Sequence, residues 1–419
     1  MAFVTLHPGQ LKGTLSVPPS KSVAHRAIIC AALAKGKSEV SPVDDSQDMK
    51  AMLQCMAALG TGFAREGRLL RLEGQGRVPD GLPVLDCLES GNTLRFLMPL
   101  SLVLAGGGRF LTSGRLAQRP LGPYEALFAR QGVALLRTAD GFFVQGGLAP
   151  GRYELPGDVS SQFITGLLLA LPLLDGDSEI LLTTPPESDG YLQLTMDTMA
   201  DFGVTVQRPN PQRFLVPGDQ SYRPRDYTVE GDYSQAAVML CAGAMGSDVA
   251  LRGLKPESHQ GDRAVIGLLQ QMGAIYTREG GICSMKAGPL QGICIDGGQF
   301  PDILPMMALV CCLSKGESRI ENAGRLRLKE CDRLTATVTE LAKLGADIRA
   351  EGDAMVIHGR DTFKGGVLVD SHNDHRMAMM LSIAALHCRE PVRLENPSCV
   401  KKTWPSYWDD YQALGGIIS

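Results

Sequence analysis

Basic side chains recur in short polar turns and loops of this sequence, in segments that read PSKSVAHR, ESGNTLR, AQRP, LKECDR, NDHR and KKTWP. Eight cations lie in these segments: Lys21, Arg26, Arg95, Arg119, Lys329, Arg333, Arg376 and Lys402. Lys and Arg bind phosphates and carboxylates, and Arg can do so through two parallel hydrogen bonds. The pattern therefore predicts a site for small anionic ligands.

The chain as a whole is slightly acidic, with 41 Lys and Arg against 45 Asp and Glu and a formal net charge of −4. The cations of the turns are therefore a local concentration, not part of a generally basic surface. Nucleic acid and anionic membranes favour broadly basic partners. We expect small molecules as partners, with no nucleic acid and no membrane.

Acids and serines share these turns with the cations. Asp302 follows Pro301, Glu330 follows Lys329, and Ser160 opens the segment SSQ. Ser, Asp and Asn cap helix N-termini, whose unpaired N–H groups favour anions. Carboxylates can also transfer protons, whereas a protein that only captures anions gains nothing by burying them. The combination favours an enzyme over a non-enzymatic anion-binding or scaffold protein.

The elements that must hold these turns recur six times, about every 70 residues. Each unit has a short apolar strand, the polar turn and an apolar helix, and later a second helix that ends in glycine before a β-hairpin. The strands are marked by Val17, Leu85, Leu155, Val229, Ile295 and Val369. The glycines that stand where a helix C-cap needs a left-handed residue are Gly60, Gly203, Gly273 and Gly345. Each unit is predicted to be β-α-β-α-β-β, which makes the chain an α/β protein.

The sixth unit stops after the helical segment SYWDDYQALGG, without its hairpin, while the first 15 residues form an extended piece without a helix. We therefore expect this piece to complete the last unit. The prediction is two domains of three repeats each. Residues 16–226 form the N-terminal domain, and residues 1–15 with 227–419 form the C-terminal domain, with the active site in the cleft between them.

Several other classes of protein lack support in the sequence. Its 11 cysteines include no CxxC pair, and its start does not resemble a signal peptide, so a reduced, cytoplasmic protein is expected. No apolar stretch is long enough to span a membrane. No GxxxxGK[ST], strand-linked GxGxxG or GxSxG is present. His372 and His375 lack further ligands, and Asn373 and Asp374 fit a helix cap, so no metal site is predicted.

The ordered segments PSKSVAHR, SSQF, LKECDRL, NDHRMAM and KKTWP resemble the 5-enolpyruvylshikimate-3-phosphate synthase family of enolpyruvyl transferases, over essentially the whole chain. The resemblance implies a two-domain, inside-out α/β barrel. It implies transfer of the enolpyruvyl group of phosphoenolpyruvate to the 5-hydroxyl of shikimate 3-phosphate, with release of phosphate, in aromatic amino-acid biosynthesis. It also implies a cytoplasmic monomer that uses no metal and no organic cofactor.

The same resemblance implies roles for individual residues. The contacts to shikimate 3-phosphate are Lys21, Ser22, Arg26, Ser160, Ser161, Gln162, Ser188, Tyr191, Asp302 and Lys329. The contacts to phosphoenolpyruvate are Lys21, Gly91, Arg119, Gln162, Arg333, Arg376 and Lys402. The catalytic candidates are Asp302, Glu330, Lys21 and Lys402. Asp302 would accept the hydroxyl proton and Glu330 would serve C3 of phosphoenolpyruvate, but the lysines can share these roles and the sequence leaves the assignment open.

The second turn departs from the family pattern. Where Asn-Ala-Gly-Thr or Asn-Ser-Gly-Thr is common, this chain has Glu89, Ser90, Gly91 and Asn92. Glu89 adds a negative charge near the expected phosphoenolpyruvate site, and the resemblance places Gly91 against phosphoenolpyruvate and the inhibitor glyphosate. Arg325 stands where some members have a polar contact residue, so that contact is not carried over.

Two related enzyme classes are alternatives. A UDP-N-acetylglucosamine enolpyruvyl transferase usually carries a cysteine on a loop of its first domain, but the matching segment here, LTSGRLAQRP, has none. An RNA-end cyclase would need a nucleophilic histidine near the C-terminus, and the last histidine here is His387, in an apolar helix.

Overall fold

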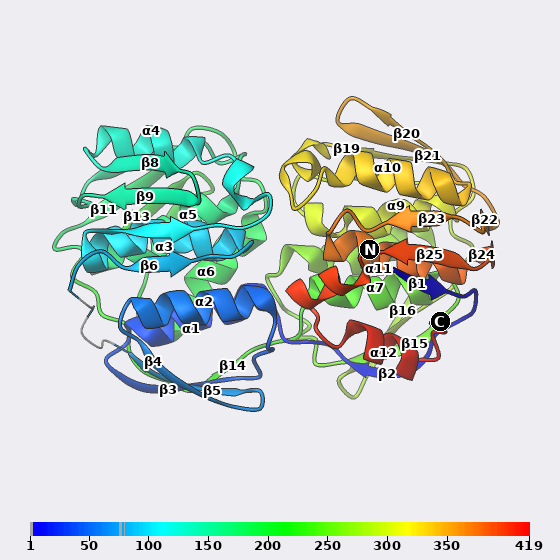
Figure 1. The fold of residues 1–419 in the computed structure, drawn as a ribbon, viewed down its shortest axis with the longest axis horizontal. Coiled ribbons are helices and arrows are strands. Elements are labelled where there is room, and N and C mark those ends of the chain that lie inside the picture. Colours follow the sequence, from blue (N-terminus) through cyan, green and yellow to red (C-terminus); the bar gives the residue numbers. More distant parts are fainter. Residues whose placement is uncertain (1–2, 75–77, 79) are drawn as a thin grey trace. The chain divides into compact units, whose positions relative to one another are not determined.

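The computed structural model describes residues 3–74, 78 and 80–419. Its second repeat consists of β6 (Val84–Asp86), α3 (Gly91–Ala105), β7 (Gly107–Leu111), α4 (Gly122–Arg130), β8 (Ala134–Thr138) and β9 (Gly141–Gln145) (Figure 1). β6 and β7 are parallel, and β9 pairs antiparallel with both β7 and β8. The helix α3 provides the crossover that the parallel pair requires.

The same strand order recurs in the third and fifth repeats. The third consists of β10 (Arg152–Leu155), α5 (Ser161–Ala170), β11 (Ser178–Leu182), α6 (Asp189–Asp201), β12 (Gln207–Asn210) and β13 (Arg213–Val216). The fifth consists of β18 (Cys294–Asp296), α9 (Leu304–Cys312), β19 (Glu317–Glu321), α10 (Arg333–Leu344), β20 (Asp347–Glu351) and β21 (Ala354–His358).

The first and fourth repeats exchange their first strands. The first repeat continues with α1 (Lys21–Leu33), β3 (Gly36–Ser41), α2 (Gln47–Ala58), β4 (Gly62–Glu66) and β5 (Leu69–Gly74). The fourth continues with α7 (Tyr233–Ala244), β15 (Asp248–Arg252), α8 (Ala264–Met272), β16 (Ile275–Glu279) and β17 (Ile282–Lys286). β2 (Lys12–Ser16) precedes α1 but pairs with β15, and β14 (Tyr227–Thr228) precedes α7 but pairs with β3.

The sixth repeat is completed by the start of the chain. It consists of β23 (Leu368–Asp370), α11 (His375–Leu386), β25 (Val392–Glu395) and α12 (Tyr407–Ala413). β1 (Phe3–Leu6) pairs antiparallel with β25, and Leu6 also bridges Ile418. β22 (Phe363–Gly365) and β24 (Cys388–Glu390) form a separate pair. The N-terminal segment therefore takes the place of the hairpin that the last repeat lacks.

The described chain forms two compact units. The first unit is residues 19–229, and the second unit is residues 1–18 with 230–419. The sequence placed the divisions at 15/16 and 226/227, three residues earlier in each case. The first division moves because β2 pairs with β15 in the second unit as far as Ser16. The second moves because Tyr227 and Thr228, in β14, pair with β3 in the first unit.

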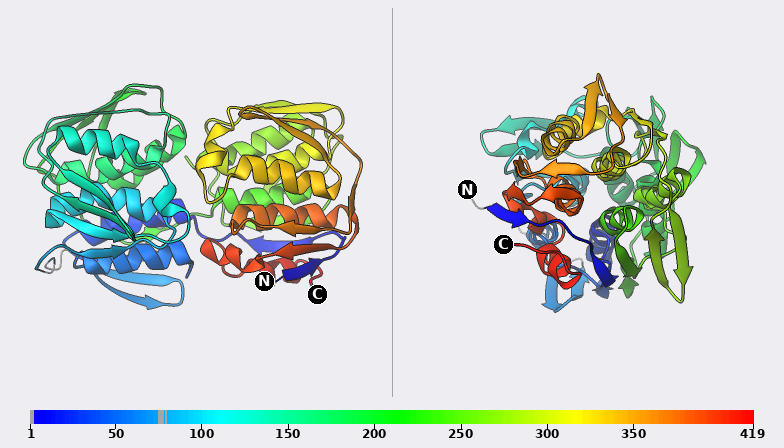
Figure 2. Two further views of the ribbon diagram at one scale, coloured as in Figure 1. Left: turned by 45° about the horizontal axis from the view of Figure 1, so that its top comes forward. Right: turned by 90° about the vertical axis from the view of Figure 1, so that its right-hand side faces the viewer.

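Each unit has its own hydrophobic core. In every repeat, one helix is buried almost all round (α1, α3, α5, α7, α9 and α11), which fits their apolar sequences. The sheets lie outside these helices and remain separate sheets of two to four strands in the described chain (Figure 2). The inside-out α/β arrangement is thus present, although its sheets do not close into a barrel.

The glycines predicted to end helices take up the expected backbone conformation. Gly60, Gly203, Gly273 and Gly345 have φ values of 97°, 83°, 109° and 105°. These values lie in the left-handed region, which costs glycine least because it has no Cβ. In the described residues, no helix combines the length and apolar character needed to cross a membrane.

Candidate active site

Serines cap the three central helices of the first unit. Ser20, Ser90 and Ser160 precede α1, α3 and α5, and each hydroxyl accepts a hydrogen bond at 3.3–3.4 Å from a backbone N–H two or three residues further on. In the second unit, aspartates cap α7 and α11 instead, at Asp232 and Asp374. A neutral cap leaves the partial positive charge of the helix N-terminus for an anion, whereas an aspartate offsets it.

Lys21 is the first residue of α1 and forms an ion pair with Asp48, in the first turn of α2. Lys21 Nζ lies 2.8 Å from Asp48 Oδ2. The lysine side chain is 20% exposed and the aspartate only 6% exposed. Asp48 therefore fixes the position of the Lys21 ammonium group and partly balances its charge. Sequence analysis missed Asp48, because 27 residues separate the two.

Arg26 is buried and connects two other predicted contact residues. Its guanidinium donates to the backbone oxygen of Ser22 at 2.7 Å and to that of Tyr191 at 3.2 Å. It also donates to Thr195 Oγ1 at 2.7 Å and Thr165 Oγ1 at 3.3 Å. Burial lowers the pKa of Arg26 to about 10, so the arginine remains charged near neutral pH. Arg26 thus fixes the backbone around Ser22 and Tyr191.

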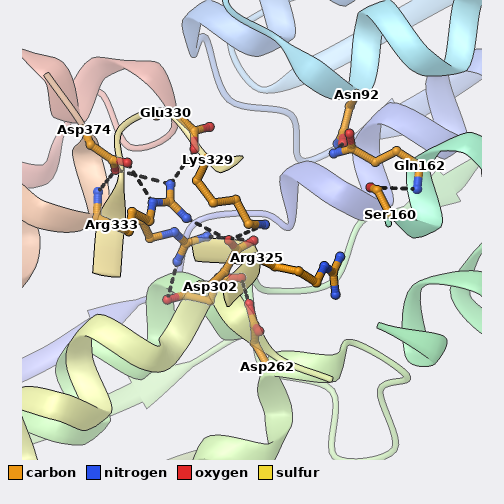
Figure 3. Close-up of polar contacts among 12 residues, drawn as sticks. Asn92, Ser160, Gln162, Asp262, Asp302, Arg325, Lys329, Glu330, Arg333 and Asp374 are labelled. Atoms are coloured by element: carbon orange, nitrogen blue, oxygen red, sulfur yellow. Dashed lines mark hydrogen bonds and ion pairs between the residues drawn. The ribbon is translucent and has the colours of Figure 1, made fainter. Parts of the chain in front are cut away.

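Gln162, in the first turn of α5, is held on both sides of its amide. Arg95 Nη1 donates to Gln162 Oε1 at 2.5 Å. Gln162 Nε2 donates to Asn92 Oδ1 at 2.6 Å, and Figure 3 shows these two amides side by side. Asn92 Nδ2 in turn lies 3.3 Å from His25 Nδ1. Arg95 was among the eight cations of the sequence but had no assigned role, and sequence analysis missed His25.

Gly91, the first residue of α3, lies against the same group. A Cβ at this position would stand 2.8 Å from Arg119 Nη1, 3.3 Å from Arg95 Nη1 and 3.4 Å from Gln162 Oε1. Arg119 itself is 9% exposed. The structure therefore places Gly91 and Arg119, both predicted to bind phosphoenolpyruvate, beside Gln162. Glu89 of the same turn is directed at Gly114, in the loop that leads to Arg119.

Ser161 and Ser188 stand at the starts of α5 and α6 and are 6% and 4% exposed. Ser188 has φ 56°, a left-handed conformation that costs a non-glycine residue about 1 kcal/mol or more. Its carbonyl accepts a hydrogen bond from the backbone N–H of Tyr191. Ser188 and Tyr191 are therefore part of one turn.

In the second unit, the guanidinium of Arg333 binds three carboxylates (Figure 3). Nε lies 2.7 Å from Asp374 Oδ2, Nη1 lies 2.8 Å from Asp302 Oδ1, and Nη2 lies 2.7 Å from Glu330 Oε2. Burial opposes the charge of Arg333, but Asp374, Glu330 and Asp302 together raise its pKa well above the usual range. Arg333 is thus the centre of the cluster.

Asp302 lies within reach of three cations. Besides Arg333, it contacts Lys329 Nζ at 3.1 Å and Arg376 Nη2 at 4.0 Å. Burial favours its neutral form, but Lys329, Arg376 and Arg333 outweigh burial and hold its pKa well below the usual range. Burial lowers the pKa of Lys329, against the charge of Asp302. Asp302 is therefore ionised in the protein without ligands.

Glu330 lies between two cations. Its Oε2 accepts from Arg333, and its Oε1 lies 3.5 Å from Lys402 Nζ. Lys402 ends the 3-10 turn Pro397–Lys402 and is 4% exposed. Arg325, which was not given a contact, donates through Nη1 to the carbonyl of Gly298 at 3.1 Å.

Two aspartates of the second unit were given no part in the site by the sequence analysis. Asp374, identified only as a helix cap, is fully buried and accepts from Arg333 and from the backbone N–H of Arg376. Asp262 is fully buried and accepts from the hydroxyl of Ser234, whose carbonyl accepts from Arg376 Nη1 at 3.1 Å. Burial, with a smaller effect of Asp302, raises the pKa of Asp262 to about 6.

No group of three or more His, Cys, Asp or Glu side chains placed to hold a metal ion occurs in residues 3–74, 78 and 80–419. His372 Nε2 donates to Glu340 Oε1 at 2.9 Å. His375 is buried, with Nδ1 at 3.7 Å from Asp374 Oδ1.

The predicted residues divide between the units. The first unit holds Lys21, Ser22, Arg26, Gly91, Arg119, Ser160, Ser161, Gln162, Ser188 and Tyr191. The second unit holds Asp302, Lys329, Glu330, Arg333, Arg376 and Lys402. In the second unit these residues form one connected network of ion pairs. Such a network can bind anions and can move protons between its acids and lysines.

Comparisons with known proteins agree with this chemistry and with the resemblance seen in the sequence. The family model for EPSP synthase (3-phosphoshikimate 1-carboxyvinyltransferase) matches residues 6–411. Proteins named 3-phosphoshikimate 1-carboxyvinyltransferase are 46% identical in Clostridium perfringens and 43% identical in Clostridioides difficile. These matches cover 100% of this chain and 99% and 98% of the relatives, respectively.

Solved structures give the same result for the fold. EPSP synthase from Acinetobacter baumannii is 25% identical and has a TM-score of 0.83, over 100% of this chain and 99% of that chain. The enolpyruvyl transferase NikO from Streptomyces tendae is 18% identical, with a TM-score of 0.82 over 100% of this chain and 98% of that chain; its likeness concerns the fold alone. The predicted enolpyruvyl-transferase fold is confirmed, and the chain belongs to the EPSP synthase (3-phosphoshikimate 1-carboxyvinyltransferase) family.

Proposed function

We propose that the predicted site residues of the two units carry out the reaction of this family. This reaction is the transfer of the enolpyruvyl group of phosphoenolpyruvate to the 5-hydroxyl of shikimate 3-phosphate, with release of phosphate. The observation that supports this most strongly is the network in which Arg333 binds three carboxylates while Asp302 meets three cations. The reaction needs both kinds of group, because its substrates carry phosphates and carboxylates and each turnover moves protons.

The first unit supplies most of the shikimate 3-phosphate site in this proposal. Lys21, Ser22, Arg26, Ser160, Ser161, Gln162, Ser188 and Tyr191 bind this substrate, together with Asp302 and Lys329 of the second unit. Serine-capped helices and the charge of Lys21 suit a phosphate. Because Arg26 is already bound to four partners of its own unit, it contributes mainly by charge and by holding Ser22 and Tyr191.

Phosphoenolpyruvate is bound by Lys21, Gly91, Arg119, Gln162, Arg333, Arg376 and Lys402. Arg suits this substrate, since its planar donors match both carboxylate and phosphate. Gly91 suits close approach of a ligand to the backbone, because no Cβ intervenes.

The chemistry proceeds by addition and then elimination. In the addition, the 5-hydroxyl oxygen bonds to C2 of phosphoenolpyruvate, the hydroxyl proton leaves, and C3 gains a proton to become a methyl group. In the elimination, the bond from C2 to the phosphate oxygen breaks, and the methyl group loses a proton to restore the double bond. Neither half changes the overall oxidation state, so acids, bases and cations suffice.

Asp302 accepts the hydroxyl proton, and its activation depends on the substrates. In the protein alone, Lys329, Arg376 and Arg333 hold its pKa well below the usual range, so it is a weak base. Substrate anions that bind these cations compete with Asp302 for them and raise its pKa. Asp302 thus gains basicity only when substrates are present.

Glu330 transfers the proton to and from C3 of phosphoenolpyruvate, and Lys402 forms an ion pair with Glu330. The contact of 3.5 Å between Lys402 Nζ and Glu330 Oε1 is close enough for the charge of one to affect the proton affinity of the other. Lys402 and Lys21 share the proton transfers as the substrates change charge.

The chain acts as a monomer on small molecules in the cytoplasm, without nucleic acid or membrane, and without a metal or organic cofactor. Its net charge of −4 gives nucleic acid no broad electrostatic attraction. All eleven cysteines are free thiols, ten of them buried, which suits a reducing compartment.

The decisive experiment measures phosphate release from phosphoenolpyruvate by the purified chain. We expect release that requires shikimate 3-phosphate, continues after treatment with a chelator, and gives one enolpyruvyl ether per phosphate. UDP-N-acetylglucosamine should not replace shikimate 3-phosphate as acceptor. Release with the nucleotide sugar alone, or no release with either acceptor, would contradict the proposal. Light scattering in the same buffer should give the mass of one chain.

A further inference from the structure

A chain of hydrogen bonds joins the three central helices of the first unit. It begins at Arg95 on α3, passes to Gln162 on α5, returns to Asn92 on α3 and ends at His25 on α1. The distances from Arg95 to Gln162, Gln162 to Asn92 and Asn92 to His25 are 2.5, 2.6 and 3.3 Å. All four residues belong to one unit.

Arg95 determines which atom donates and which accepts in each of these hydrogen bonds. A guanidinium only donates hydrogen bonds, so Gln162 must turn Oε1 towards Arg95 and Nε2 towards Asn92. Asn92 must then present Oδ1 to Gln162, which leaves its Nδ2 to donate to His25 Nδ1. The ring nitrogen Nδ1 has to accept, so His25 must carry its proton on Nε2.

The burial of His25 favours the neutral ring that this requirement needs. Its side chain is fully buried, and burial is the main reason why its pKa is lowered to about 3. The positive charges of Lys21 and Arg26 also lower this pKa, whereas the negative charge of Asp48 opposes the shift. The ring is therefore neutral near neutral pH. A neutral imidazole has one donor and one acceptor nitrogen, as the chain demands.

The chain also determines what Gln162 offers to a ligand. Oε1 is taken by Arg95, and one N–H of Nε2 is taken by Asn92. The remaining N–H of Nε2 is a donor, which suits a phosphate, carboxylate or hydroxyl oxygen. A reversed amide would instead present an oxygen lone pair to an anion.

We propose that Asn92 is a positioning residue, which together with Arg95 holds the amide of Gln162 so that Gln162 presents a hydrogen-bond donor to the anionic substrates. The proposal rests on the function proposed above. It explains the departure of this turn from the family pattern, since an asparagine supplies both the acceptor for Gln162 and the donor for His25. A threonine or serine has a single hydroxyl for both contacts.

The first test is spectroscopic and needs no substrate. In ¹⁵N-labelled protein, the two ring nitrogens of each histidine distinguish the tautomers, and His25→Gln identifies the signals of His25 among the seven histidines. We expect the Nε2–H tautomer in the wild type. Asn92→Asp keeps the acceptor for Gln162 but turns a second oxygen towards Nδ1, so His25 should change to the Nδ1–H form or become protonated. The Nδ1–H form in the wild type, or no change in Asn92→Asp, would overturn the proposal.

The second test is a double-mutant cycle of Asn92→Ala and Gln162→Ala. Asn92→Ala should lower kcat/KM for both substrates by about tenfold, the effect of one lost neutral hydrogen bond. If Asn92 acts through Gln162, the double variant should match Gln162→Ala within about twofold. Multiplicative losses would overturn the proposal. Gln145→Ala, an exposed amide on β9 of the same unit, is the matched control and should retain full activity.

The two tests separate this proposal from the proposed function. Suppose that the wild-type protein has the Nε2–H tautomer and responds to Asn92→Asp as expected, but does not turn over shikimate 3-phosphate and phosphoenolpyruvate. This result would contradict the proposed function but not the proposed series of hydrogen bonds. Normal turnover with the opposite tautomer would contradict the role of Asn92 alone.

Discussion

Arg333 and Asp374 form a two-point ion pair in the interior of the second unit. Arg333 Nε lies 2.7 Å from Asp374 Oδ2, and Nη2 lies 3.2 Å from Oδ1. Asp374 also caps α11 by accepting from the backbone N–H of Arg376 at 2.8 Å. The pair therefore joins the N-terminus of α10 to that of α11 and holds two predicted phosphoenolpyruvate ligands, Arg333 and Arg376, in fixed positions.

Arg333→Ala should destabilise the second unit strongly and raise the KM for phosphoenolpyruvate. The substitution leaves the carboxylate of Asp374 buried without its charged partner, and breaking such a pair costs about 3–5 kcal/mol. Urea unfolding at neutral pH measures the loss. Arg349→Ala is the matched control, because Arg349 pairs with Glu351 at the surface, where a pair contributes about 1 kcal/mol or less. Equal losses in the two variants would mean that the network does not stabilise the fold.

Asp302→Asn and Glu330→Gln should each lower kcat by about 10²–10⁴-fold, the range for one general acid or base, while the fold survives. The amides keep the size of the side chains and still accept hydrogen bonds from Arg333. Steady-state kinetics with both substrates, together with circular dichroism, check this. Asp353→Asn, at an exposed carboxylate paired with Arg327, should keep wild-type turnover. If both active-site amides turned over normally, neither acid would belong in the mechanism.

Much of this arrangement could be predicted from the sequence, because it depends on local patterns. The serine caps at Ser20, Ser90 and Ser160 stand directly before apolar helices. The glycines at Gly60, Gly203, Gly273 and Gly345 stand just after the second helices of their repeats. Helix capping is a contact between residues two or three positions apart, so the sequence displays it. The cations of the turns could be found for the same reason.

The missed residues act through contacts that sequence spacing does not reveal. Asp48 pairs with Lys21, 27 residues away. Asp262 lies in the 3-10 turn Gly261–Arg263 of the generally polar segment ESHQGDR, where its residue type alone does not distinguish it. His25 stood within a quoted motif, but its environment depends on α3 and on burial. The exchange of first strands between the first and fourth repeats was not predicted, because pairing partners far apart in the chain leave no local pattern and β14 has only two residues, Tyr227 and Thr228.

Asp262→Asn should make the stability of the protein less dependent on pH. Burial raises the pKa of Asp262 to about 6, above the ordinary value of 3.8 for an aspartate. Between these values the folded state binds more protons than the unfolded state, so this residue makes stability fall as pH rises from about 4 to about 6. The asparagine does not ionise and can still accept from Ser234.

The stability gained by Asp262→Asn over the wild type should therefore grow from pH 4 to pH 6 and then stay constant. Urea unfolding at pH 4.5, 5.5 and 7 measures it. Asp158→Asn, at an exposed carboxylate of the first unit, should show no comparable trend. A gain for Asp262→Asn that is the same at all three pH values would show that the carboxyl does not titrate in this range.

Gly91→Ala should fold normally. It should weaken inhibition by glyphosate more than it weakens the binding of phosphoenolpyruvate. Gly91 is absent from the residues with positive φ, so alanine suits its backbone. The new methyl group would stand 2.8 Å from Arg119 Nη1, and the flexible end of Arg119 must move aside. In the proposed site Arg119 binds phosphoenolpyruvate, so this movement should weaken the contact and raise the KM for phosphoenolpyruvate by a few fold. Glyphosate, the longer molecule, should be obstructed by the methyl group as well. Inhibition curves for the two proteins at equal ratios of phosphoenolpyruvate to KM measure the difference. Coincident curves would mean that Gly91 serves only the turn and does not line the site.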